Sequence, residues 1–308
     1  MKKTILLTGA TGFLGSHLLE ALLNNNYQVV ILKRSFSDAW RINHLIDNVK
    51  SYDLDKDPLE HAFKDQPIDV VIHLATLYRK FDKGKEVSEM IASNVTFPVE
   101  IIECGIRHGL KGFINTGTFF EYDCSVLPVR EDAPFKPFNL YAKTKLAFEN
   151  ILVTYSSSIS TMTLRLFSLY GEKDNAKLIP MLIQKALKKE TMELSDGLQK
   201  LDFVYSADII DAYLKALNVI HAFKPKHQVF NIGSGSPVSV REVVSILEQQ
   251  LGTSVKKTWG KPSEFDISIV FADISRARKD LSWKPEHSIH EGMEKTIRYY
   301  AKRNETWR

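Results

Sequence analysis

The chain has 308 residues, of which 44% are hydrophobic and 25% charged, proportions typical of a globular protein with a substantial core. Its formal net charge of +4 is small for this length, so we expect neither nucleic acid nor a membrane surface as a partner. The two cysteines argue against a disulfide scaffold or a zinc site, and the lack of a leader segment or an apolar run of membrane length indicates a cytoplasmic protein.

A glycine-rich segment near the N-terminus is the first functional signal. Residues 3–7 form an apolar run of strand length, residues 8–15 carry three glycines at G-x-x-G-x-x-G spacing, and residues 16–23 have helical periodicity. A strand, a glycine turn and a helix in this order bring backbone N–H groups up to a pyrophosphate. We therefore predict a dinucleotide site. The predicted contacts in this segment are Gly9, Thr11, Gly12, Phe13, Leu14 and Gly15.

The end of the second predicted strand, residues 27–32, indicates which dinucleotide is bound. An acidic residue at this place accepts hydrogen bonds from the ribose in NAD-binding proteins, but here Lys33 and Arg34 follow the strand. Two cations would bind a 2′-phosphate, so we expect NADP(H) rather than NAD(H); the alternative is two solvated charges at a loop edge. Asp53 and Leu54 follow another short segment and are expected near the adenine.

Strands and helices then alternate to about residue 168. Apolar runs predict strands over residues 69–74, 113–116 and 162–167, and helical patterns cover residues 87–108 and 141–155. This alternation predicts an α/β fold, a Rossmann-type doubly wound parallel sheet. Because ligands bind such sheets at the carboxyl ends of the strands, the residues after each strand matter most.

The pattern changes in the second half of the chain. We expect strands over residues 200–204 and 229–233, the latter in the main sheet, and helices over residues 178–188, 208–218, 238–251 and 289–301. We predict that residues 1–168, with about 202–233 returning to them, form the dinucleotide-binding domain. Residues 169–201 and 234–308 would form a smaller, interleaved C-terminal lobe that binds the substrate.

A tyrosine and a lysine at the start of the predicted helix 141–155 suggest redox chemistry. Tyr141 and Lys145 lie four residues apart and share one helix face. A free tyrosine has a pKa of about 10, and a nearby ammonium lowers it. Thr116 ends a strand and can donate a hydrogen bond to the same carbonyl oxygen as Tyr141. Alone, the pair could be an ordinary amphipathic helix contact; its position after that strand favours catalysis.

Nine motifs in order relate the chain to a known family. They are residues 8–15, 73–76, Asn94, 115–116, Tyr141 with Lys145, 164–171, 202–208, 230–233 and 281–285. With them the chain resembles, over essentially its whole length, the sugar-nucleotide-modifying members of the extended short-chain dehydrogenase/reductase family.

The resemblance implies a catalytic set of Thr116, Tyr141 and Lys145, a nucleotide-sugar substrate and a homodimer. Tyr141 and Lys145 would also contact the cofactor. On the same basis, further cofactor contacts are expected at Leu74, Ala75, Thr76, Asn94 and Phe167, and substrate contacts at Thr118, Ser168 and Lys177.

Three reactions compete within this family. Dehydratases carry an Asp-Glu pair directly after the catalytic threonine, where this chain has Gly117 and Thr118, so we regard dehydration as excluded. Epimerases hold NAD, which Lys33 and Arg34 argue against. We therefore expect NADPH-dependent reduction of a nucleotide-linked 4-keto-6-deoxy sugar. The alternatives are an NAD-dependent 4-epimerase and a non-catalytic NADP-binding sensor.

Three departures from the family pattern leave the substrate's identity open. Thr116 is followed by Gly-Thr-Phe-Phe-Glu, Ser168 stands where many relatives have asparagine, and Asp202 lacks the usual neighbouring arginine. All three positions are expected near the sugar or the nucleotide.

Overall fold

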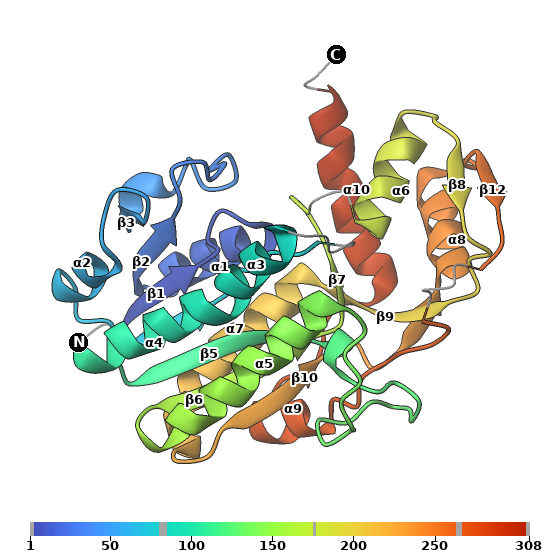
Figure 1. Cartoon of the computed structure of the whole chain (residues 1–308). Helices are drawn as coiled ribbons and strands as arrows, with labels where there is room; N and C mark the ends of the chain where they lie inside the picture. Colours follow the sequence, from blue (N-terminus) through green and yellow to red (C-terminus); the bar gives the residue numbers. More distant parts are fainter. Residues whose placement is uncertain (1–2, 80–84, 175–176, 263–266, 306–308) are drawn as a thin grey trace. The chain divides into compact units, whose positions relative to one another are not determined.

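The computed structural model describes residues 3–79, 85–174, 177–262 and 267–305. The chain divides into two compact units, which are described separately here. The first comprises residues 1–123, 132–166 and 210–230, and the second comprises residues 124–131, 167–209 and 231–308. The chain therefore passes between the units several times, as Figure 1 shows by its sequence colouring.

A seven-stranded parallel sheet forms the centre of the fold and confirms the predicted Rossmann-type architecture. Its strands are buried along most of their length, as expected for a parallel sheet covered on both faces. In spatial order they are β10 (Gln228–Ile232), β6 (Ser160–Leu166), β5 (Gly112–Thr118), β4 (Val70–His73), β1 (Thr4–Thr8), β2 (Gln28–Lys33) and β3 (Lys50–Asp53).

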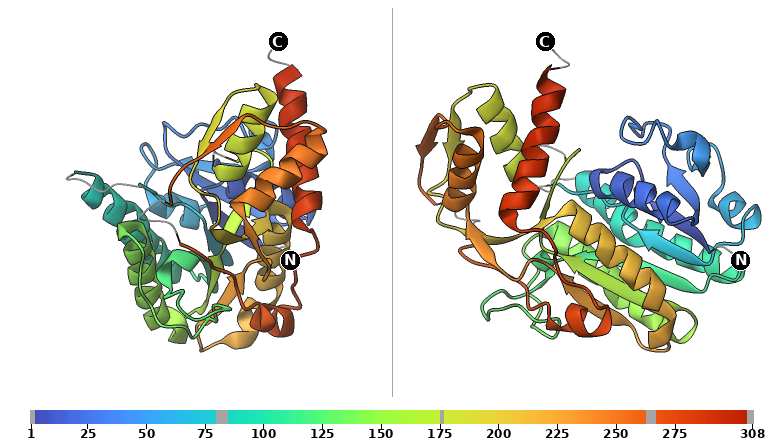
Figure 2. Two further views of the ribbon diagram at one scale, coloured as in Figure 1. Left: turned by 90° about the vertical axis from the view of Figure 1, so that its right-hand side faces the viewer. Right: turned by 180° about the vertical axis from the view of Figure 1, so that it is seen from behind.

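Helices cover both faces of this sheet. The pair α4 (Phe97–Arg107) and α5 (Leu140–Thr154) lies on one face, and α1 (Phe13–Asn24) and α7 (Ser206–Val219) lie on the other (Figures 1 and 2). The shorter helices are α2 (Leu59–Lys64) and α3 (Lys85–Ile91). Under α4 and α5, Phe113 and Phe148 are fully buried with ring centroids 5.8 Å apart, so aromatic packing anchors α5 to the sheet.

The second unit has its own core. Three strands, β11 (Pro237–Ser239), β9 (Lys200–Tyr205) and β7 (Ser168–Tyr170), form one small sheet, and β12 (Lys257–Trp259) pairs with β8 (Met192–Leu194). The helices α6 (Leu178–Leu187), α8 (Val240–Leu251) and α10 (Ile289–Glu305) pack together around buried apolar side chains, and a short helix, α9 (Ser275–Asp280), precedes α10. None of the described helices is both long and apolar enough to cross a membrane.

The start of one predicted helix is displaced by a strand. The helix expected from residue 238 begins at Val240, because Pro237–Ser239 pairs with β9 as strand β11. Ser239 then caps the helix: its hydroxyl accepts from Glu242 N, and the Glu242 carboxylate accepts from Ser239 N. The segment that rejoins the first unit is residues 210–230, whereas β9 pairs within the second unit. The assignment of a substrate lobe stays a prediction.

Candidate active site

The glycine loop lies between β1 and α1 and leaves no room for side chains at two positions. Gly9 has a φ of +70°, and a Cβ there would lie 2.7 Å from the backbone nitrogen of Ala75. A Cβ on Gly15 would lie 2.0 Å from the carbonyl oxygen of Gly9. Gly12 precedes α1, which has no side-chain cap and no acidic residue in its first turn among the described residues. The first-turn N–H groups are thus suited to a pyrophosphate.

Thr8 fixes the neighbouring turn after β4. Its hydroxyl oxygen accepts from the N–H groups of Leu74 and Ala75, both at 3.1 Å, and therefore donates its proton to Nδ1 of His73 at 2.9 Å. Burial, helped by the charge of Lys145, holds the pKa of His73 well below its usual value. His73 is thus a neutral acceptor that helps to hold the carboxyl ends of β1 and β4 together.

Asn94 connects this turn to α5. It lies in a π-helical segment, Ala92–Thr96, between α3 and α4, an irregularity often found near functional sites. Its Oδ1 accepts from Thr76 Oγ1 and Leu77 N, and its Nδ2 donates to Leu77 O and Thr144 Oγ1, all within 3.1 Å. Since the amide already makes four hydrogen bonds, Asn94 in this structure positions the turn and the start of α5.

The basic pair after β2 faces carboxylates that arrive from β3. Parallel pairing places Lys33 opposite Asp53, with 3.6 Å between Nζ and Oδ2. Arg34 Nε donates to Asp55 at 2.7 Å, and this hydrogen bond lowers the pKa of the Asp55 carboxyl. Leu54 N also donates to Lys33 O at 2.9 Å, which joins the two loops. The positive charges of the pair are therefore neutralised by neighbouring acids.

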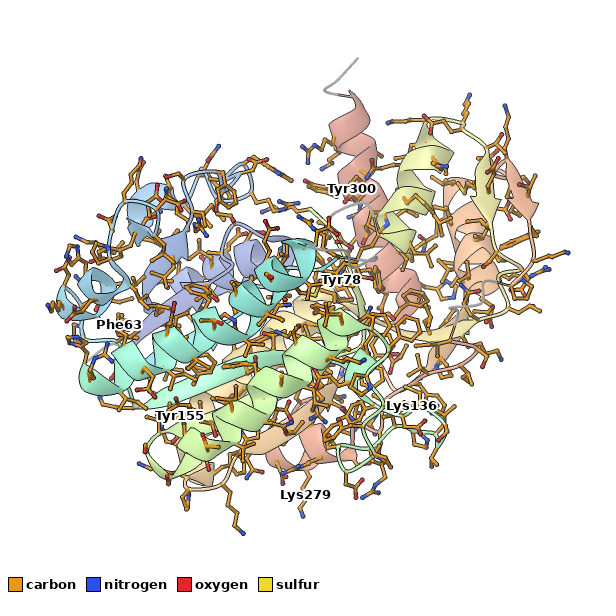
Figure 3. All side chains as sticks on the ribbon, in the orientation of Figure 1. Phe63, Tyr78, Lys136, Tyr155, Lys279 and Tyr300 are labelled. Carbon is orange, nitrogen blue, oxygen red and sulfur yellow. The ribbon has the colours of Figure 1, made fainter. Side chains whose placement is uncertain are left out.

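The predicted catalytic residues come from β5 and α5. Thr116, near the end of β5, donates from Oγ1 to His73 O at 2.8 Å and lies 2.6 Å from the hydroxyl of Tyr213. Asn139 caps α5 by accepting from Ala142 N at 2.9 Å, which fixes the turn that carries Tyr141. The ring of Tyr78 packs edge-on against that of Tyr141, with centroids 5.0 Å apart (Figure 3 labels Tyr78).

Burial dominates the pKa values of Tyr141 and Lys145, the predicted catalytic pair. It raises the pKa of the Tyr141 phenol, and the nearby Glu121 carboxylate adds to the rise. It lowers the pKa of Lys145 to about 8, against the opposing effect of Glu121 and Glu149. The lowering of the Tyr141 pKa that we expect from Lys145 therefore does not outweigh the burial of the phenol in this structure.

A buried ionic cluster lies beneath this site. Arg165, on β6, pairs with Glu149 of α5 and with Glu121, whose Oε2 lies 3.0 Å from Arg165 Nε. All three side chains are buried, and the guanidinium also lies over the rings of Tyr122 and Phe135. Burial and repulsion from Glu149 raise the pKa of Glu121 to about 7.

Sequence reasoning missed three residues that contact the predicted site or the carboxylates beside it. Arg165 carried a signal, a charge between two leucines inside a predicted strand. Tyr213 lies on a buried helix face where an aromatic residue suggests only packing. Arg41, stacked on Trp40 with 4.4 Å from its Cζ to the ring centroid, donates to Thr11 O at 3.4 Å and carried no local signal.

The predicted substrate contacts are divided between the units. Thr118 ends β5, and its hydroxyl accepts from Phe120 N at the start of a 3₁₀ turn, Phe119–Glu121. Ser168 begins β7 and Lys177 precedes α6, both in the second unit, as does Phe167, a predicted cofactor contact that is buried. Thr118 lies in the first unit with most of the predicted site residues, and the roles of all of them stay predictions.

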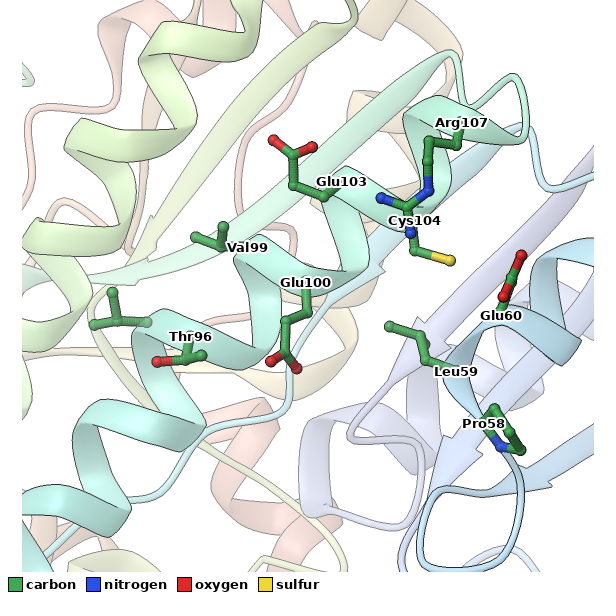
Figure 4. A pocket seen from close by; sticks show the side chains of 10 residues that line it. Pro58, Leu59, Glu60, Thr96, Val99, Glu100, Glu103, Cys104 and Arg107 are labelled. Carbon is green, nitrogen blue, oxygen red and sulfur yellow. The ribbon is translucent and has the colours of Figure 1, made fainter.

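A separate pocket of about 620 Å³ lies between α2 and α4. Figure 4 shows the side chains of Glu60 on α2 and of Glu100, Glu103 and Arg107 on α4 around it. None of the predicted site residues lines this pocket. We attach no role in the chemistry to it.

Comparisons with known proteins agree with this geometry. A family model described as "NAD dependent epimerase/dehydratase family" matches residues 5–233. The chain is 30% identical to a putative UDP-glucose 4-epimerase of Methanocaldococcus jannaschii, covering 98% of this chain and 100% of that protein. It is also 30% identical to a CDP-abequose synthase of Salmonella muenchen, covering 96% of this chain and 98% of that protein.

One similar solved structure contains bound molecules of its own. The UDP-glucuronic acid 4-epimerase of Bacillus cereus, in complex with UDP-glucuronic acid and NAD, has a TM-score of 0.88 and 29% identity. The alignment covers 97% of this chain and 99% of that one.

The prediction of NADP(H) is therefore wrong. Structures that share this fold hold NAD, which favours NAD(H). The physical reason lies in the pairing of β2 with β3: Asp53 and Asp55 already neutralise Lys33 and Arg34, so the loop is no longer a strongly cationic site for a 2′-phosphate. Lys33 and Arg34 therefore do not indicate NADP binding, contrary to what their sequence suggests.

Proposed function

Because the chain belongs to the NAD-dependent epimerase/dehydratase family, whose members act on nucleotide sugars, we propose that it reduces the 4-keto group of a nucleotide-linked 4-keto-6-deoxy sugar with NADH. The observation that carries this proposal is the catalytic set, Thr116, Tyr141 and Lys145, next to a Gly117-Thr118 pair that holds no acid or base.

The first unit offers residues suited to the cofactor. The N–H groups at the start of α1 would hold the pyrophosphate, and Gly12, which has no side chain, would let it approach the main chain. Lys145 would bind the nicotinamide ribose. When bound, the reduced cofactor supplies a hydride, so that each turnover consumes one NADH and one proton and yields NAD⁺ and an alcohol.

Residues of the chain itself would transfer the proton to the carbonyl oxygen. Tyr141 would give its phenolic proton to the carbonyl oxygen as the neighbouring carbon gains the hydride, and solvent would then reprotonate the phenolate. The Lys145 ammonium would stabilise that phenolate, and Thr116 would donate a hydrogen bond to the same oxygen. The raised pKa of Tyr141 keeps the phenol protonated before the reaction.

The carboxylates near the site argue against dehydration. Dehydration needs an acid and a base beside the sugar, and the nearest carboxylate after Thr116 is Glu121. Glu121 is buried, accepts from Thr118 N at 2.8 Å and pairs with Arg165. Its carboxylate is therefore already bound by other groups of the protein and does not serve as an acid or base for the sugar. The similarity to a CDP-abequose synthase supports a role in deoxysugar synthesis.

An NAD-dependent 4-epimerase is the second candidate. A relative named putative UDP-glucose 4-epimerase matches the chain as well as a CDP-abequose synthase does, and the favoured cofactor is the one that we expect of an epimerase. An epimerase would use the same three residues, removing and returning one hydride within a single turnover without net consumption of NADH.

Net cofactor consumption separates the two reactions. We expect stoichiometric NADH oxidation, followed at 340 nm, with at least one of the CDP-, dTDP-, UDP- or GDP-linked 4-keto-6-deoxy sugars. Epimerisation of UDP-glucose or UDP-glucuronic acid with catalytic NAD⁺ alone, and no NADH oxidation with any keto sugar, would replace the reductase by the epimerase. Inactivity in both assays would refute both.

The acidic partner of Arg34 should control cofactor choice. We expect Asp55→Ala to free Arg34 from its hydrogen bond and to strengthen NADPH binding about 5- to 10-fold relative to NADH, since a released guanidinium can bind a 2′-phosphate. The ratio of the two dissociation constants, measured by fluorescence titration, tests this. Asp38→Ala removes an acid that accepts from Trp40 instead, and should leave the ratio unchanged. Equal shifts in both variants would exclude a specific role for Asp55.

A further inference from the structure

We propose that Tyr213 is a positioning residue that forces Thr116 to act as a hydrogen-bond donor toward the reacting oxygen of the substrate. This inference rests on the proposed hydride-transfer chemistry but concerns a residue outside the catalytic set. Tyr213 lies on α7, 97 residues along the chain from Thr116, and the fold brings their hydroxyls to 2.6 Å. The short distance is the starting observation.

The direction of this hydrogen bond follows from counting protons. Thr116 has one hydroxyl proton, and it donates that proton to His73 O at 2.8 Å. The 2.6 Å contact therefore requires Tyr213 to donate to Thr116. Because Tyr213 is fully buried, and burial raises its pKa, the phenol keeps its proton at neutral pH. Tyr213 is thus a permanent donor to Thr116.

The hydrogen bond that Thr116 accepts from Tyr213 restricts the direction in which Thr116 can donate its own proton. With a lone pair of Oγ1 taken by the Tyr213 proton, the Thr116 proton must point elsewhere, toward an acceptor. At present that acceptor is His73 O; a substrate carbonyl oxygen that reaches Thr116 would share or take over the same proton. Hydrogen bonds in a chain polarise one another, so Tyr213 also strengthens the bond that Thr116 donates.

The hydrogen bond from Thr116 stabilises the reacting oxygen most when negative charge develops on that oxygen. The reacting oxygen becomes more negative as its carbon receives the hydride, so a donor already aimed at it stabilises the transition state more than the ground state. Tyr213 also lies close enough to Tyr141 for charge on the Tyr141 phenol to raise its pKa.

Packing by itself does not account for the hydroxyl of Tyr213. A phenylalanine ring would fill the same buried site on α7 without bringing a polar atom that needs a partner. Among the residues that the structure describes, Thr116 is the hydrogen-bond partner of this hydroxyl. Its orientation toward a predicted catalytic residue is what points to a role in the reaction.

A double-mutant cycle on hydride transfer tests the proposal. We expect Tyr213→Phe to lower kcat about 5- to 10-fold, the range of one lost hydrogen bond, with little change in KM. In a Thr116→Val background the same substitution should have no further effect on kcat, because the donor that Tyr213 orients is gone. Equal losses in both backgrounds, or an unchanged kcat in the single variant, would overturn the proposal.

Two further measurements separate a positioning role from a structural one. Tyr300→Phe removes another buried phenol, which donates to Asp174 O at 3.1 Å in the second unit, and should leave kcat unchanged. A loss as large as that of Tyr213→Phe would overturn the assignment. The cycle is also measured as Tm without substrate. There Tyr213→Phe should lower Tm in the wild-type background but not with Thr116→Val, since Tyr213 then has no acceptor.

The Tm cycle keeps the two proposals distinguishable. If the wild-type protein transfers hydride to no nucleotide sugar, the proposed function fails, while coupling in Tm still reports whether Tyr213 and Thr116 are bonded as described. If Tm shows no coupling, the bond is absent and the positioning role fails, whatever the enzyme's substrate.

Discussion

Tyr141→Phe should lower the turnover number at least about 100-fold, because it removes the positioned acid and leaves the ring in place. The carbonyl oxygen would then have to take its proton from water while the hydride is transferred. The capped first turn of α5 and the packing of Tyr78 do not depend on the hydroxyl, so the fold and cofactor binding should survive. Steady-state NADH oxidation gives the turnover number, and thermal unfolding checks the fold.

A second tyrosine provides the control for this result. Tyr155, directly after α5, donates its hydroxyl to the exposed Glu103, outside the predicted site. Tyr155→Phe should therefore leave turnover within about twofold of wild type. An unchanged turnover in Tyr141→Phe would remove Tyr141 as the acid, and with it the strongest support for hydride transfer to a carbonyl.

Arg165→Leu should destabilise the protein by about 3–5 kcal/mol, the effect expected when a buried ion pair loses one partner. The substitution would leave Glu121 and Glu149 buried without their shared cation. It would also remove the stacking of the guanidinium over the rings of Tyr122 and Phe135. The measurement is the free energy of unfolding in urea, for the full chain.

Two comparisons separate the charge effect from the loss of volume. Arg298→Leu breaks an exposed pair with Glu294 and should change the free energy of unfolding far less. Replacing Glu121 and Glu149 by glutamine together with Arg165→Met should recover much of the stability, since no unpaired charge remains. If Arg165→Leu costs no more than Arg298→Leu, the buried cluster does not stabilise the fold in this way.

The same cluster links the stability of the fold to Lys145, the predicted catalytic lysine. Glu121 and Glu149 oppose the fall in the pKa of Lys145 that burial causes. They also come from the two elements that hold the site, the turn after β5 and helix α5. Arg165 therefore joins two carboxylates that would otherwise repel one another, and both of them act on the charge of Lys145.

Local patterns were sufficient wherever the relevant contacts are close in sequence. The glycine spacing identified the turn between β1 and α1, because Gly9 and Gly15 meet within seven residues and neither tolerates a side chain. The spacing of Tyr141 and Lys145 placed both on one face of α5, because a helix repeats every 3.6 residues. The apolar runs likewise located most strands of the parallel sheet.

The sequence by itself thus determined the fold class, the dinucleotide loop and the Tyr141–Lys145 pair, since their physics acts over a few residues. Only the tertiary structure decided which charges and hydroxyls meet. Parallel pairing of β2 with β3 brought Asp53 to Lys33 and Asp55 to Arg34, so the basic pair no longer favours the 2′-phosphate of NADP. It also brought Tyr213 to Thr116 across 97 residues. A charge or a hydroxyl acquires its role from the partners that surround it, and those partners are chosen by how the strands and helices pack.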